Sequence, residues 1–100
     1  MTWSSAARVQ TDAPDRYAKQ LAAHLGRKVP VVETDAGQRL DFDTRGSATL
    51  VSEPGLLRLE AVSDTAEGLA QVQDVVARHL VRFGTRAELV VEWEEPREQG

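Results

Sequence analysis

The stretch between residues 39 and 61 contains two segments in which apolar and charged residues alternate, and this pattern constrains the fold most strongly. The apolar positions are Leu40, Phe42, Leu57, Leu59 and Ala61. Charged residues such as Asp41, Arg58 and Glu60 stand between them. Because the side chains of a strand point alternately to its two faces, the segments predict strands with one apolar and one hydrated face. Such strands are typical of an antiparallel sheet that is covered on one side only.

A first helix is predicted before these strands. Tyr17, Leu21 and Leu25 recur at four-residue spacing, which indicates an amphipathic helix of about three turns. We expect Asp12 to be its N-cap, because a carboxylate there accepts hydrogen bonds from the first free N–H groups. We expect Gly26 to end the helix in the left-handed conformation.

A second helix is predicted over residues 64–83. Its apolar stripe follows three- and four-residue spacing: Leu69, Val72, Val76, Leu80 and Phe83. We expect Ser63 or Asp64 to cap its start, since Asp64 and Glu67 have the spacing of a capping box. Gly84 is expected to end it.

The complete pattern gives the order β-α-β-β-β-β-α-β. The predicted strands cover residues 6–11, 29–34, 39–43, 47–52, 57–61 and 88–93. We therefore expect an α+β two-layer sandwich, in which both helices cover one face of a mostly antiparallel sheet. One domain is expected over residues 6–94, with flexible termini at 1–5 and 95–100.

The composition excludes several classes of function. The 100 residues include no cysteine, which rules out disulfides, thiolate metal sites and thiol nucleophiles. The net charge of −4 argues against nucleic-acid binding, which depends on a basic face. No apolar run approaches the roughly 20 residues that span a bilayer, and the first residues lack the apolar core of a signal peptide. We expect a cytoplasmic protein that does not bind membranes.

The two histidines occur in similar phrases, AAHLGRK at residues 22–28 and ARHLVRF at residues 77–83. On a helical wheel, His24 and His79 each lie roughly 60–65° from the centre of the apolar stripe, at a half-covered position. One interpretation is that each histidine, with the arginines and lysine beside it, caps the C-terminal carbonyls of its helix. The other is a single site that uses both imidazoles, for a metal ion or a proton transfer.

The predicted topology favours the first interpretation. The succession of strand directions makes the two helices antiparallel, which places His24 and His79 at opposite ends of the helix layer. Even a three-turn helix is about 16 Å long, far beyond the roughly 2.1 Å of a metal–imidazole bond. We therefore expect the two rings to titrate independently, and no tight divalent metal to bind the monomer.

Asp41 and Asp43 form a second candidate site, as a carboxylate pair for a metal ion or for acid–base catalysis. At positions i and i+2 of a strand they would share the hydrated face with Arg39. We expect cross-strand ion pairing with Arg58 instead. The sequence contains neither a glycine-rich phosphate loop nor a nucleophile-elbow motif.

Two blocks, residues 8–31 and 75–93, resemble the bacterial domain-of-unknown-function 2218 family, and the resemblance covers residues 6–94. The matching positions are Arg16, Tyr17, Gln20, Leu21, His24, Lys28, Val75, Val76, His79, Leu80, Arg82, Phe83, Arg86, Glu88, Leu89 and Trp93. The resemblance implies a small stand-alone bacterial protein whose family has no established activity. It also implies a link to siderophore-interacting flavoproteins, which related domains sometimes accompany. Family members often carry a histidine at position 27, where this chain has Arg27, and the difference weakens the interpretation of the first block as a metal site.

We expect a small binding or interaction module without catalysis of its own, typical of structural-genomics targets. Its contact surface is either the hydrated sheet face or a set of ligand-binding candidates: His24, Arg27, Lys28, His79, Arg82 and Arg86. The expected partner is a protein or a small anionic ligand, with no cofactor and no metal, and the chain is expected to be a monomer or a weak homodimer. One alternative is an accessory protein in iron acquisition that binds an anionic chelate. Another is an enzyme that uses His79 for acid–base catalysis.

Overall fold

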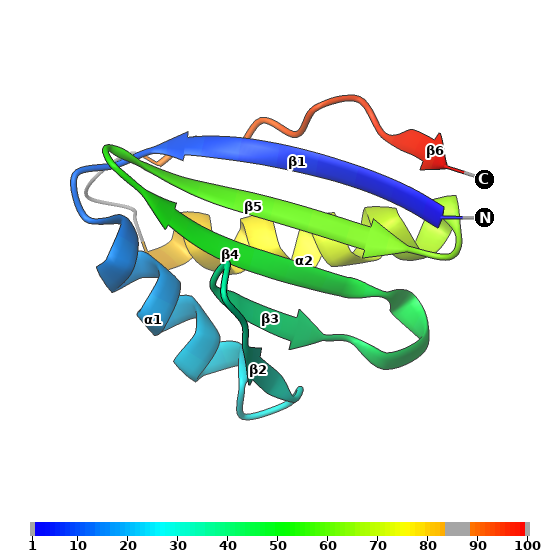
Figure 1. The fold of residues 1–100 in the computed structure, drawn as a ribbon, viewed down its shortest axis with the longest axis horizontal. Coiled ribbons are helices and arrows are strands. Elements are labelled where there is room, and N and C mark those ends of the chain that lie inside the picture. Colours follow the sequence, from blue (N-terminus) through cyan, green and yellow to red (C-terminus); the bar gives the residue numbers. More distant parts are fainter. Residues whose placement is uncertain (1, 84–88, 100) are drawn as a thin grey trace.

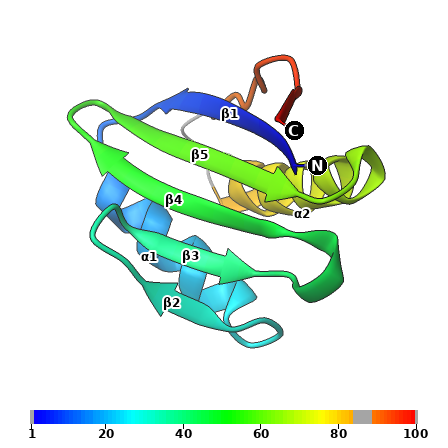
Figure 2. The ribbon, with the colours of Figure 1, turned by 45° about the vertical axis from the view of Figure 1, so that its right-hand side comes forward.

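A computed structural model, which describes residues 2–83 and 89–99, shows one antiparallel sheet with two helices against one face (Figure 1, Figure 2). The elements are β1 (Thr2–Gln10), α1 (Pro14–Leu25), β2 (Val31–Glu33), β3 (Gln38–Asp41), the 3-10 turn η1 (Asp43–Arg45), β4 (Ser47–Glu53), β5 (Leu56–Ser63), α2 (Ala66–Phe83) and β6 (Arg97–Gln99). In space the strands follow the order β2-β3-β4-β5-β1-β6. The predicted α+β sandwich and its element order are confirmed.

The register of the central strands builds the apolar face of the sheet. β5 pairs with β1 on one side and with β4 on the other, so that Leu59 lies between Ala7 and Leu50. All three side chains are buried. Leu40 and Phe42 are buried as well, as their alternation with charged residues predicts. The inner face is therefore a continuous apolar surface that both helices must cover.

α2 contributes the apolar stripe that its sequence predicts. Four of its residues are at most 1% exposed: Leu69, Val72, Val76 and Leu80. The expected cap at Ser63 or Asp64 is wrong, because the hydroxyl of Thr65 accepts the N–H of Gly68 at 2.9 Å and starts the helix one or two residues later. The Ser63 hydroxyl instead accepts the N–H of Thr65. The predicted end at Gly84 lies outside the described residues.

α1 buries Tyr17, Leu21 and Leu25, as predicted. Its start differs, because Ala13 occupies the cap position without a side-chain bond, which Asp12 was expected to supply. Its end differs too, since Gly26 has a φ of −62°, in the right-handed and not the left-handed region. Neither helix in the described part of the chain is long and apolar enough to cross a membrane.

The two ends of the chain lie side by side at one edge of the sheet. β1 begins at Thr2 instead of at residue 6, and β6 pairs with its first residues. The last strand was expected over residues 88–93, but this segment forms only an isolated bridge between Ala7 and Trp93 where it is described. Pairing of the terminal residues thus replaces the expected final strand. The domain boundaries and the flexibility of the termini remain predictions.

Leu80 provides a test of the helix assignment. It is fully buried in the middle of the core, so Leu80→Ala should lower the free energy of unfolding by about 2–5 kcal/mol. The next residue, Val81, is 42% exposed, and Val81→Ala should change it by less than about 0.5 kcal/mol. Urea unfolding of both variants measures the difference. Equal effects would show that the buried face of α2 is assigned wrongly.

Candidate functional site

The two histidines lie together where α1 and α2 meet. The ring centroids of His24 and His79 are 5.1 Å apart, with an angle of 45° between the ring planes. Phe83 was predicted only as a core residue. Its ring packs edge-on against the His24 ring, with the two ring centroids 5.2 Å apart. The expectation that the two histidines lie at opposite ends of the helix layer is therefore wrong.

The error comes from the geometry of the helices and not from the strand directions, which are as predicted. α1 crosses α2 obliquely instead of lying alongside it (Figure 1, Figure 2). α2 is also longer, with 18 residues against 12 in α1, and His79 lies a full turn before its end. His24, in the last turn of α1, meets this inner turn of α2. Both rings are half-buried, as the helical wheels indicate.

A backbone hydrogen bond determines the tautomer of His79. Its Nδ1 lies 2.7 Å from the carbonyl oxygen of Val75. A carbonyl only accepts hydrogen bonds, so Nδ1 carries the hydrogen and Nε2 of the neutral ring holds a lone pair. Val75 is eight residues before the end of α2, and its carbonyl is not one of the free carbonyls at that end. The interpretation of His79 as a helix cap is therefore wrong.

The cationic candidates gather around His24. Burial lowers the pKa of His24 below its ordinary value of 6.5, and the charges of His79, Arg27, Lys28 and Arg82 lower it further, in that order. Arg27 and Lys28 are exposed residues directly after α1, whereas Arg82 lies on α2 one turn after His79. The charge of His79 is thus one cause of the lowered pKa of His24, and whether the two rings titrate independently remains to be measured. The last candidate, Arg86, lies outside the described residues.

This arrangement suits a negatively charged ligand better than a metal cation. Within the described ranges, no carboxylate forms an ion pair with His24 or His79, and no group of three or more histidine or acidic residues has the geometry to hold a metal. We expected that no divalent metal binds tightly, partly because the two rings were expected to lie far apart. The observed distance between the rings removes that reason. That no divalent metal binds tightly stays a prediction, supported by the repulsion between the surrounding cations and a divalent ion.

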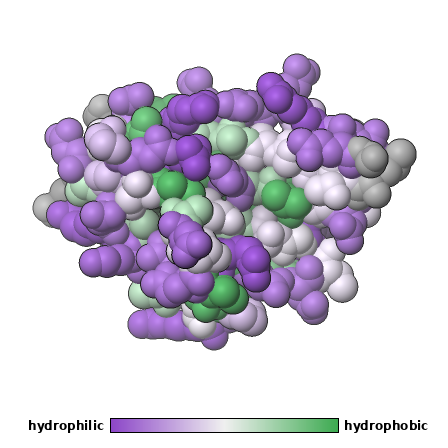
Figure 3. All heavy atoms as spheres, viewed as in Figure 1, coloured by the Kyte–Doolittle hydropathy of each residue, from purple (hydrophilic) through white to green (hydrophobic). Residues whose placement is uncertain are grey.

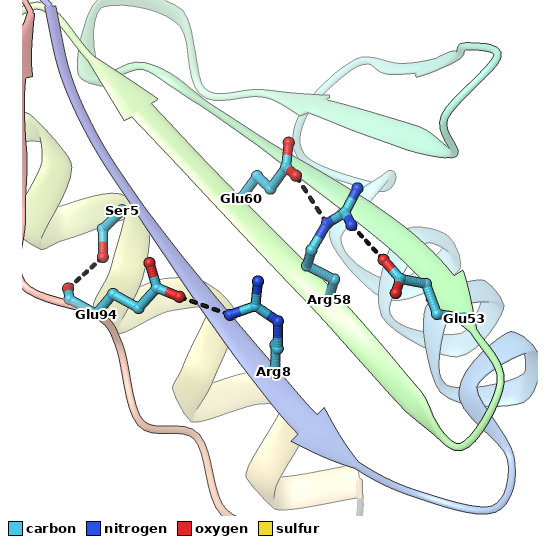
Figure 4. Close-up of polar contacts among 6 residues, drawn as sticks. All are labelled: Ser5, Arg8, Glu53, Arg58, Glu60 and Glu94. Atoms are coloured by element: carbon cyan, nitrogen blue, oxygen red, sulfur yellow. Dashed lines mark hydrogen bonds and ion pairs between the residues drawn. The ribbon is translucent and has the colours of Figure 1, made fainter.

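The open face of the sheet presents a different kind of surface. Arg8 on β1 pairs with Glu94 at 2.7 Å, and Arg58 on β5 lies between Glu53 and Glu60 (Figure 4). Glu53 belongs to the neighbouring strand β4, Glu60 to β5 itself and Glu94 to the C-terminal segment, and each partly neutralises the arginine that it pairs with. In the space-filling view of this face, apolar side chains are scattered among hydrophilic ones (Figure 3). The face is hydrated, as predicted, and two of its arginines, Arg8 and Arg58, are already paired.

The carboxylates Asp41 and Asp43 form no pair with Arg58, so the expected ion pair is wrong. Asp43 lies beyond the strand, in η1, with a positive φ of 62°. Asp41 instead accepts the backbone N–H of Asp43 at 2.9 Å, which stabilises the turn. The Asp41 carboxylate therefore has a local structural role at this turn.

Comparisons with known proteins agree with this fold. The model of a family described as "Uncharacterized protein conserved in bacteria (DUF2218)" matches residues 6–94. The protein of "NMR structure of PA4090 from Pseudomonas aeruginosa" is 30% identical, with a TM-score of 0.75 over 94% of this chain and 96% of that one. The "De novo designed protein Foldit4" has a TM-score of 0.56 at 10% identity over the full length of both chains, which concerns the fold alone. The search of curated proteins gave no match.

The lowered pKa of His24 predicts that stability depends on pH. The unfolded chain binds this proton near pH 6.5, whereas the folded chain binds it only at lower pH. Between these two values the unfolded state holds more protons, so the free energy of unfolding rises with pH. The stabilisation is complete above pH 6.5 and is lost as the pH falls.

Urea unfolding of the wild type and of His24→Gln, from about pH 7.5 down to about pH 5.5, tests this dependence. The wild type should lose more stability than the variant over this range. Parallel losses would mean that His24 has the same pKa in the folded and unfolded chains.

Proposed function

The chain belongs to the bacterial DUF2218 family, and we propose that it is a small binding module that holds an anionic ligand at the His24–His79 pair, without catalysis of its own. The observation that carries this proposal is the contact between the two imidazoles among positively charged side chains. We further propose a cytoplasmic setting, which the absence of cysteine fits, and a monomer or weak homodimer with no nucleic-acid or membrane partner.

Local charge supports an anionic ligand. The chain carries a net charge of −4, yet Arg27, Lys28 and Arg82 all act on the same histidine ring. Guanidinium and ammonium groups bind carboxylate, phosphate and sulfate through charge-assisted hydrogen bonds. The concentration of positive charge in an acidic protein attracts anions to this place and not to the rest of the surface.

The open face of the sheet is a less suitable binding site for an anion. Two of its arginines, Arg8 and Arg58, already pair with carboxylates of the C-terminal segment, of β4 and of β5 itself (Figure 4). An incoming anion would have to displace these carboxylates before it bound either arginine. At the helix crossing, Arg27 and Lys28 pair with no carboxylate in the described part of the chain, so this is the better contact surface.

Charge reversal at Lys28 tests the proposal. Sulfate titrated at constant ionic strength should shift the amide signals around His24 and His79. Lys28→Glu should weaken this binding about two- to thirtyfold, because it replaces one exposed attraction with a repulsion. The control is Lys19→Glu, which changes the net charge equally but lies roughly 140° around α1 from His24 and should leave binding unchanged.

If both substitutions weakened sulfate binding equally, the effect would come from the net charge of the protein and not from a local site. If the amide signals around His24 and His79 did not shift when sulfate was added, the proposed site itself would be contradicted.

One observation favours a second candidate, an anionic metal chelate of the kind used in iron acquisition. The lone pair at Nε2 of His79 is a metal-ligand atom whose ring is oriented by the bond from Nδ1 to the Val75 carbonyl. The surrounding cations would then hold the carboxylates of the chelate. Citrate and ferric citrate separate the two candidates, since tighter binding of the ferric form, lost in His79→Gln, supports the chelate.

A further inference from the structure

The histidine pair also indicates how protons enter the binding step, an inference that rests on the proposed anion binding. We propose that an oxyanion binds at Nε2 of His79, and that an oxyanion without a hydrogen of its own, such as sulfate, brings one proton with it from solution. An oxyanion that carries a hydroxyl, such as hydrogen phosphate, binds there without an added proton. The site would therefore distinguish two classes of anion by their hydrogen-bonding capacity.

The argument starts from the hydrogen bond to Val75. The 2.7 Å contact between Nδ1 and the carbonyl oxygen keeps the ring hydrogen on Nδ1. The neutral imidazole has a single N–H, so Nε2 is left as an acceptor. The ring is half-buried on α2, with His24 5.1 Å away, and its second nitrogen is the atom left for a ligand.

An oxyanion such as sulfate has only acceptor atoms. Its oxygen and the lone pair at Nε2 repel each other, and no hydrogen lies between them. Uptake of one proton at Nε2 turns this atom into a charged donor, and the N–H then bonds to the anion. Hydrogen phosphate avoids this requirement, because its own O–H donates to the lone pair.

The neighbouring charges fit this coupling. The ring of His24 on α1 is 5.1 Å from that of His79, Arg27 and Lys28 follow α1 and act on His24, and Arg82 lies on α2 itself. Arg78, also on α2, is 4.0 Å from Asp74 and partly neutralised by it. The strands that pack against α2 present apolar side chains to it, and the backbone of Arg45 lies near Gly68, at the opposite end of the helix. A proton taken up at Nε2 of His79 adds a positive charge to this region, and a bound anion offsets the repulsion between that charge and the nearby cations.

The tautomer of the free protein is the first measurement. Two-bond nitrogen–proton correlation spectra of the ring should show the hydrogen of neutral His79 on Nδ1. A hydrogen on Nε2 would overturn the proton-uptake proposal, whether or not anions bind.

The second measurement is calorimetry with sulfate in two buffers of different ionisation enthalpy, near pH 7.5. Sulfate remains a dianion throughout this range, so any proton that is bound enters the protein. We expect about one proton per sulfate and an affinity that falls up to about tenfold per pH unit as the pH rises. Hydrogen phosphate should show clearly smaller uptake.

Two variants assign the proton. His79→Gln supplies an amide N–H that donates without a charge, so sulfate binding should persist with little proton uptake. His24→Gln should retain the uptake. The reverse result, with uptake lost only in His24→Gln, would overturn the assignment to His79.

Failure of this proposal and failure of the proposed function differ in outcome. Sulfate that binds without proton uptake contradicts the coupling alone and leaves an anion-binding module. Absence of sulfate binding from about pH 5 to about pH 8 contradicts both.

Discussion

The apolar face of the sheet is the constraint on which the rest of the structure depends. Leu50, Leu59 and Ala7 form part of one continuous buried surface, and the opposite face is hydrated. Both helices must therefore lie in the same layer. α2 takes the long direction of the sheet, and the shorter α1 crosses the remaining area obliquely (Figure 1). The contact between the helices, and with it the contact between His24 and His79, follows from covering one surface with two helices of unequal length.

This origin explains why the site lies at the edge of the core. Residues at the boundary of an apolar stripe face the neighbouring helix on one side and water on the other. His24 and His79 occupy such positions, and Phe83 contacts the first ring. Burial and neighbouring cations then act on the same imidazole, and an anion can still approach from solvent. The core therefore positions the two rings without enclosing them.

Periodicity in the sequence predicted the helices, the strands and their order, because burial on one face leaves a regular trace in the chain. The helix caps were harder to predict, since Ser63, Asp64 and Thr65 can all accept hydrogen bonds and only the local backbone selects Thr65. The pairing of Arg58 also depends on register, because alternation assigns a face but not a cross-strand neighbour. The approach of His24 to His79 depends on the crossing angle and the lateral position of α1, which strand directions do not specify. The sequence did contain one indication of this contact, because both histidines lie at the boundary of an apolar stripe and both helices belong to a single layer.

The central claim is that the two imidazoles form one site, and a titration of the ring protons by NMR tests it most directly. The charge of His79 is one of the causes that lower the pKa of His24. Replacing His79 with glutamine should therefore raise the midpoint of the His24 titration, and Lys19→Gln should leave it unchanged. An identical His24 curve in the wild type and in His79→Gln would contradict the shared site and return the two histidines to separate structural roles.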